Sequence, residues 1–98
     1  MKESKVQEEL LNTISETISS IDRLRDKAYQ QYRSTVRMIL QDEITEEKQI
    51  ERIMDGLLDF CDEQRFLKLY KELCRHIFDR YPQLVGEHIS IYLSLIHI

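Results

Sequence analysis

The chain has 98 residues, of which 14 are basic and 18 acidic, and its formal net charge is −4. This length allows one domain with one modest core, and the acidic balance gives no general attraction to nucleic acid or anionic membranes. Two glycines and one proline are too few for the many turns of a β-rich fold. The composition therefore predicts an all-α protein.

Localisation is predicted from the cysteines and the N-terminal segment. Cys61 and Cys74 both fall on predicted apolar helix faces. The first ten residues, MKESKVQEEL, lack the apolar core of a signal peptide, and no window holds the ~18 apolar residues of a membrane span. Two buried thiols without a secretory signal are typical of a reducing compartment. We therefore expect a cytoplasmic protein without membrane association.

The first predicted element is a long amphipathic helix over residues 5–41, which contain neither glycine nor proline. Its apolar side chains share one arc of a helical wheel, and Arg25 is the only charge inside that arc. The period of 3.6 residues holds without drift, which predicts a fairly straight helix of roughly 55 Å. The arc includes Val6, Leu10, Leu11, Ile14, Ile18, Ile21, Leu24, Ala28, Tyr29, Tyr32, Val36, Ile39 and Leu40.

A break is predicted at residues 42–47, DEITEE, with Thr45 as the expected N-cap of the next helix. The apolar pattern resumes at Ile50 nearly in phase with the first helix. A single helix over residues 5–61 is therefore the alternative.

The second predicted helix covers residues 46–61. It carries a row of like charges, Glu51, Asp55 and Asp59, whose repulsion must be offset by tertiary contacts or a cation. Gly56 lies on its polar side, where glycine weakens a helix by about 1 kcal/mol relative to alanine. The sequence offers no packing reason for this glycine.

A third helix is predicted over residues 63–81, after a turn at residues 61–63 with Asp62 as the expected N-cap. Without the turn, the apolar faces of the second and third helices would point about 180° apart. The third helix has an apolar arc of roughly half its circumference, which is typical of a helix that contacts two neighbours. Pro82 ends this helix and can open a new one.

The segment after Pro82 allows a short C-terminal helix, with Leu84, His88, Tyr92 and Leu95 on one side, or an extended tail. Residues 93–98, LSLIHI, resemble one reading frame of the transposase mosaic end used in sequencing-library preparation. We therefore expect a single helical domain over residues 1–88 and an apolar, partly artefactual tail over residues 89–98.

Neither a metal site nor a catalytic site is predicted. The sequence has no C-x-x-C or H-x-x-x-H spacing, and His76 lies on the opposite side of the third helix from Cys74. Glu87 and His88 come nearest to an acid–base pair, without a nucleophile elbow or phosphate loop. We expect a protein that is not an enzyme and has no cofactor or small-molecule substrate. We interpret its thiols as buried and its histidines as surface residues.

A nucleic-acid site is the first of two candidate binding surfaces. Residues 23–41 contain five basic side chains and only one acidic side chain, Asp26. Tyr29 and Tyr32 lie among them, but on the apolar arc, so we interpret them as core residues rather than stacking platforms. The candidate phosphate contacts are Arg23, Lys27, Arg33 and Arg37.

A protein interface is the second candidate. If the second and third helices fold back as a hairpin, they cover about half of the first helix and leave its N-terminal stripe bare. Such a stripe usually marks an interface, and a second copy of the chain is the simplest partner. If the third helix covers the stripe instead, the monomer is self-satisfied; the sequence does not decide between the two. The candidate interface residues are Val6, Leu10, Ile14, Ile18 and Ile21.

The segments ERIMDGLLDFCDE and FLKLYKELCRHIFDRYPQLVGEH resemble a family of short all-α proteins of unknown function from Gram-positive gut anaerobes, often encoded among mobile-element genes. The most specific parts are LYKELC at residues 69–74 and YPQLVG at residues 81–86. The resemblance covers residues 1 to about 89 and implies no activity or catalytic residue. We therefore expect a cytoplasmic helical interaction module, self-associating and accessory to a mobile element. A weak nucleic-acid-binding accessory factor is the alternative.

Overall fold

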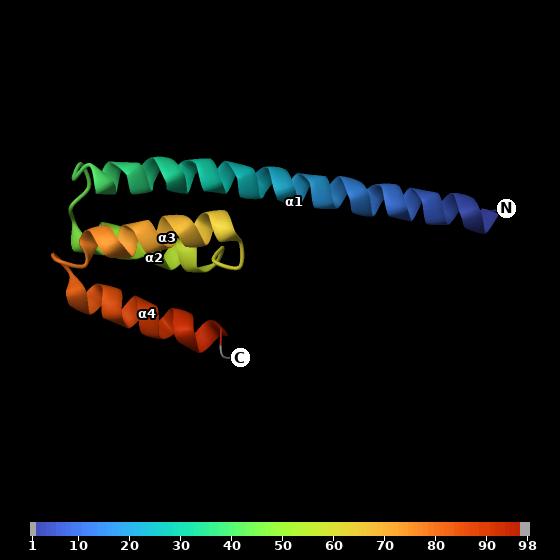
Figure 1. Ribbon diagram of the computed structural model, residues 1–98. Helices are drawn as coiled ribbons and strands as arrows, with labels where there is room; N and C mark the ends of the chain where they lie inside the picture. The colour runs from blue at the N-terminus through green and yellow to red at the C-terminus, as the bar shows by residue number, and fades with distance from the viewer. Residues whose placement is uncertain (1, 97–98) are drawn as a thin grey trace. The chain divides into compact units, whose positions relative to one another are not determined.

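The computed structural model describes residues 2–96 and the side chains of residues 5–95. This part of the chain forms four helices and no strand: α1 (Lys2–Leu40), α2 (Glu47–Leu58), α3 (Gln64–Ile77) and α4 (Pro82–Ile96) (Figure 1). The predicted all-α fold is confirmed. The chain after Pro82 is helical rather than extended, and the last two residues of the predicted tail lie outside the described residues.

The chain divides into two compact units, Met1–Gln30 and Gln31–Ile98. The described part of the first unit is helical throughout. The second unit combines the last turns of α1 with α2, α3 and α4 around one core. The buried apolar residues of this core are Val36, Ile39, Ile50, Met54, Leu57, Phe66, Leu69, Tyr70, Leu73, Cys74, Ile77, Leu84 and Val85.

Helix α3 packs against two other helices of the second unit. It contacts both α2 and α4, and the three helices lie side by side in Figure 1. Six of its side chains are buried, and they recur at the spacing of a wide helical face. The prediction that this helix contacts two neighbours is confirmed.

Three aromatic rings from three segments form the centre of this core. The Phe66 ring stacks on the Phe60 ring, with centroids 4.6 Å apart and an interplanar angle of 16°. The Tyr32 ring lies 6.0 Å from Phe60 and 6.4 Å from Phe66, edge-on to the latter. Tyr32 was predicted to be a core residue; its ring packs against two rings of the second unit, but its side chain is only half-buried.

Gly56 has a packing reason that the sequence does not reveal. A Cβ at this position would overlap the Tyr32 hydroxyl and lie 3.0 Å from the ring carbon Cζ. The structure thus supplies the packing reason for Gly56 that the sequence does not offer. The backbone of α2 approaches the Tyr32 ring so closely that only a residue without a side chain fits between them.

Helix α1 ends in a Schellman motif. The Asp42 N–H donates to the Ile39 carbonyl at 3.0 Å, and the Glu43 N–H donates to the Met38 carbonyl at 2.9 Å. Both carbonyls would otherwise be left unpaired at the helix end. The motif requires a left-handed residue at its centre, and Asp42 occupies it with φ 59°. Glycine is the usual residue at this position.

Substitutions at Asp42 should therefore separate backbone conformation from side-chain contacts. We expect Asp42→Gly to be more stable than Asp42→Ala by about 1 kcal/mol, because both lose the Asp42 side chain but only glycine adopts φ > 0 without steric conflict. Asp42→Ala should lower the free energy of unfolding by about 1 kcal/mol, and Asp42→Asn should be nearly neutral, since asparagine tolerates this conformation. Urea unfolding followed by circular dichroism measures all three. Equal stabilities of the Gly and Ala variants would contradict the left-handed conformation.

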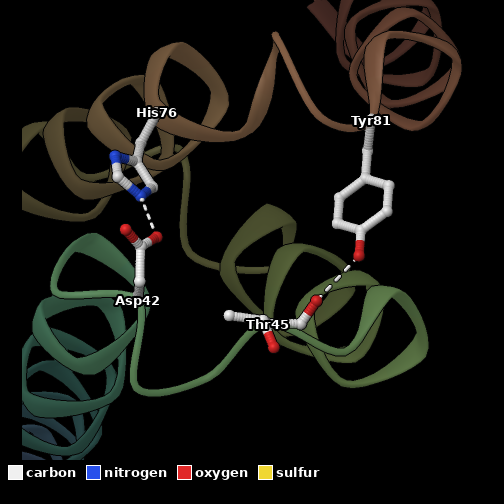
Figure 2. A network of polar contacts seen from close by, with 4 residues as sticks. All are labelled: Asp42, Thr45, His76 and Tyr81. Atoms are coloured by element: carbon white, nitrogen blue, oxygen red, sulfur yellow. Dashed lines mark hydrogen bonds and ion pairs between the residues drawn. The ribbon is translucent and has the colours of Figure 1, made fainter.

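Two polar contacts connect the segment between α1 and α2 to the residues at the end of α3 (Figure 2). Asp42 Oδ1 lies 3.0 Å from His76 Nε2, and the Tyr81 hydroxyl donates to the Thr45 carbonyl at 2.7 Å. The Asp42 contact is exposed and contributes at most about 1 kcal/mol. The break between α1 and α2 is therefore real, and the alternative of one helix over residues 5–61 is wrong.

The predicted helix caps and ends need correction. The N-cap of α2 is Glu46 rather than Thr45, and the N-cap of α3 is Glu63 rather than Asp62; neither glutamate makes a side-chain cap hydrogen bond. α2 ends at Leu58 and α3 at Ile77, three and four residues before the predicted ends. α3 ends earlier than predicted because the Arg80 and Tyr81 N–H groups both donate to the Ile77 carbonyl, and these hydrogen bonds turn the chain before Pro82. Pro82 opens α4 as predicted.

Candidate interaction surface

The first unit carries a row of large aliphatic side chains along α1, which we call the α1 apolar face. Each of these side chains is 48–66% exposed. The five predicted interface residues all belong to it, and the structure adds two neighbours from the same arc that the prediction omitted. The α1 apolar face consists of Val6, Leu10, Leu11, Ile14, Ile18, Ile21 and Leu24.

Polar side chains beside this face are satisfied within the helix. The Thr13 hydroxyl donates to the Glu9 carbonyl at 2.8 Å, and the Thr17 hydroxyl donates to the Thr13 carbonyl at 2.9 Å. Threonines bonded in this way leave no unpaired donor when an apolar surface covers them. The α1 apolar face can therefore be covered without burying an unsatisfied hydroxyl donor at either threonine.

The four predicted phosphate contacts are all exposed on α1. Arg23 and Lys27 stand one turn apart in the first unit, and Arg33 and Arg37 one turn apart in the second. The Arg23 Nε–H donates to the Ser19 carbonyl at 3.4 Å. Because the Tyr32 ring packs against the stacked pair of Phe60 and Phe66, it does not offer a free stacking surface. Nucleic-acid binding at these residues would rest on phosphate contacts.

A cavity of about 180 Å³ lies beside the polar contacts of Figure 2. Four isoleucines line its apolar part, and five polar residues line the rest. This volume is below the roughly 300–1,000 Å³ of typical ligand sites. The cavity therefore gives no support for a small-molecule substrate. The lining residues are Ile39, Ile44, Ile50, Ile77, Asp42, His76, Asp79, Arg80 and Tyr81.

His88 is a core residue, contrary to its interpretation as a surface histidine. Its side chain is 3% exposed, and its Nε2 lies 3.1 Å from Asp55 Oδ1 on α2. Its Nδ1 has no hydrogen-bond partner among the described residues. The contact also gives Asp55 a tertiary partner within its row of like charges, as the sequence required. The signal that could have identified His88 as buried is its place in line with Leu84 and Tyr92.

Cys74 lies in the core, whereas Cys61 is only half-buried, contrary to the prediction that both thiols are buried. Both thiols remain protonated at neutral pH. Burial raises the pKa of Cys61 to about 11, with smaller contributions from Cys74 and Asp62. Burial also raises the pKa of Cys74 and of the neighbouring Tyr70 phenol. Because the thiolate is the nucleophile and metal ligand, these thiols are poorly suited to either role. Cys61 instead donates its S–H to the Leu57 carbonyl at 3.2 Å.

Alkaline pH should destabilise the second unit through these groups. The folded chain holds its Cys61, Cys74 and Tyr70 protons to higher pH than the unfolded chain, whose groups titrate at about 8.5 and 10. Between the pKa values of the unfolded chain and the higher pKa values of the folded chain, the unfolded state binds fewer protons than the folded state. The free energy of unfolding therefore falls as pH rises through this range. We expect the urea midpoint to fall between pH 8.5 and about 11. Cys61→Ala should make the fall shallower; an identical slope would contradict the assignment to Cys61.

Among the side chains of residues 5–95, no three His, Cys, Asp or Glu residues gather in a way that could hold a metal ion. None of the described helices combines the length and the apolar character needed to cross a membrane. Comparison of the chain with protein-family models, with curated proteins and with solved structures finds no match.

Proposed function

We propose that this protein is a non-catalytic helical interaction module that associates with itself through the α1 apolar face. The observation that carries the proposal is the exposure of seven large aliphatic side chains on one helical face. At roughly 80 Å² each, they present about 550 Å² of apolar surface, which is near the upper end of the largest apolar patch on a typical monomer, and such patches are often functional.

The energetics of helices support the same proposal. A helix in a folded protein gains most of its stability by packing an apolar face, rather than from intrinsic propensity. In the first unit, the residues that would supply this packing are exposed. A partner that covers these exposed side chains would therefore bind to α1 and stabilise it. The small cavity beside Asp42 and the protonated thiols are poorly suited to catalysis.

Sedimentation velocity of the full chain tests this proposal. We expect a dimer or larger species at tens of micromolar, and a monomer for the variant Ile14→Asp/Ile18→Asp, because two carboxylates on each face cannot be buried without partners. Phe78→Asp is the matched control, because Phe78 is also apolar and 54% exposed but lies in the second unit. A full chain that stays monomeric at these concentrations would overturn self-association.

A further inference from the structure

We propose that the α1 apolar face pairs in the antiparallel direction with the same face of a second copy, centred at the level of Glu16. This inference rests on the proposed function and specifies its geometry. The occupant must be apolar, elongated and about as long as the face, which spans roughly 27 Å from Val6 to Leu24. The same helix of a second chain meets each of these requirements.

The area available is sufficient for a specific dimer. Seven half-exposed aliphatic side chains on each of two copies would bury roughly 1,100 Å², above the about 1,000 Å² expected of a biological interface. The hydroxyls of Thr13 and Thr17 are bonded to the carbonyls of their own helix and can enter the interface. A second copy therefore needs no additional element to form a stable contact.

The direction follows from the charges of the first unit. Residues 5–16 carry one basic and three acidic side chains, net −2, and residues 17–30 carry three basic and two acidic side chains, net +1. Parallel pairing would place each half beside itself, acidic against acidic, whereas antiparallel pairing places opposite signs together. These charges are Lys5, Glu8, Glu9 and Glu16, then Asp22, Arg23, Arg25, Asp26 and Lys27.

The register centred at Glu16 is compatible with the spacing of the aliphatic residues and is chosen for the position that it gives to Arg25. With Glu16 at the centre of two antiparallel helices, Leu11 lies opposite Ile21 and Ile14 lies opposite Ile18. Arg25, the one charge on the face, then lies opposite Gln7 and beside Glu8 of the other copy. A polar position of this kind is a common means of selecting one register in paired helices. In an in-register parallel dimer every charge of the first unit, Arg25 included, would lie level with its own copy, whereas in this antiparallel register only Glu16 does.

Disulfide trapping in the full chain tests the geometry. Gln7→Cys and Arg25→Cys are made in separate chains, mixed and oxidised, and the products are assigned by peptide mass spectrometry. Antiparallel pairing predicts that the mixed disulfide exceeds each homodisulfide by about tenfold, because only the mixed pair brings the two Cα atoms within bonding range. Glu9→Cys lies outside the face and should not cross-link to Arg25→Cys.

The outcomes separate this inference from the function on which it rests. An excess of homodisulfides, or no cross-link in a chain that sediments as a dimer, overturns the antiparallel geometry and leaves self-association in place. A chain that sediments as a monomer and forms no cross-link overturns self-association and, with it, the pairing.

Discussion

Phe66→Ala should lower the free energy of unfolding by about 3–5 kcal/mol, the range for removing a fully buried aromatic side chain. Phe66 is completely buried and contacts both other rings of the aromatic centre. Domains of this size are stable by about 5–15 kcal/mol, so the variant would lie close to unfolding. Urea unfolding of the purified variant, followed by circular dichroism, measures the loss.

Phe78→Ala is the matched control for this prediction. Phe78 follows directly on α3, but its side chain is 54% exposed. We expect a loss below about 1 kcal/mol, as for most surface substitutions. If the two phenylalanine variants lose equal stability, Phe66 is not the centre of the core.

The sequence predicted the helices and their faces because these depend on local information. A period of 3.6 residues is visible within one segment, and it correctly placed Leu69, Leu73 and Ile77 on the buried side of α3. The phase difference between the second and third helices correctly required a turn near residue 62. Each of these predictions needed only neighbours along the chain.

The helix boundaries were predicted less well because more than one local rule applies there. Thr45 and Asp62 are favourable N-caps by residue type, yet the chain uses Glu46 and Glu63 without side-chain caps. The end of α1 is instead determined by backbone hydrogen bonds around Asp42, a residue whose left-handed conformation is not evident from its type alone. Boundaries in this protein follow backbone turns rather than capping side chains.

The features that the sequence could not predict join residues far apart in the chain. His88 is buried because α4 packs against α2. There its Nε2 contacts the carboxylate of Asp55, a residue 33 positions earlier in the sequence. The candidate interaction surface, in contrast, is made by residues that lie close together in the sequence. Its five predicted residues could be identified from the apolar stripe of the first helix alone. The sequence could not decide whether another helix covers this stripe, because that decision requires the exposed fractions of its side chains.

Gly56→Ala should lower the free energy of unfolding by about 1–2 kcal/mol, although helix propensity alone predicts a gain of about 1 kcal/mol. The added Cβ would overlap the Tyr32 hydroxyl. The ring cannot easily move away, because it lies against Phe60 and Phe66. Forcing a methyl group into such a site typically costs about 1–3 kcal/mol, which outweighs the gain in propensity.

Gly86→Ala provides the matched comparison, because it is the only other glycine and also lies inside a helix. A Cβ at Gly86 would meet no atom within 4 Å. Here the propensity term acts alone, so we expect stabilisation by about 0.5–1 kcal/mol. The same substitution should thus have opposite signs at the two glycines, which unfolding of both variants under identical conditions would reveal.

The double variant Gly56→Ala/Tyr32→Phe identifies the cause of the loss. Removing the hydroxyl eliminates the atom that overlaps the new methyl group but leaves the ring carbon Cζ at 3.0 Å, so the rescue should be partial. We expect the two substitutions together to be about 1 kcal/mol less destabilising than the sum of their separate effects. Strict additivity would mean that Gly56 and Tyr32 do not contact each other. A stabilising Gly56→Ala would mean that the Tyr32 ring lies elsewhere.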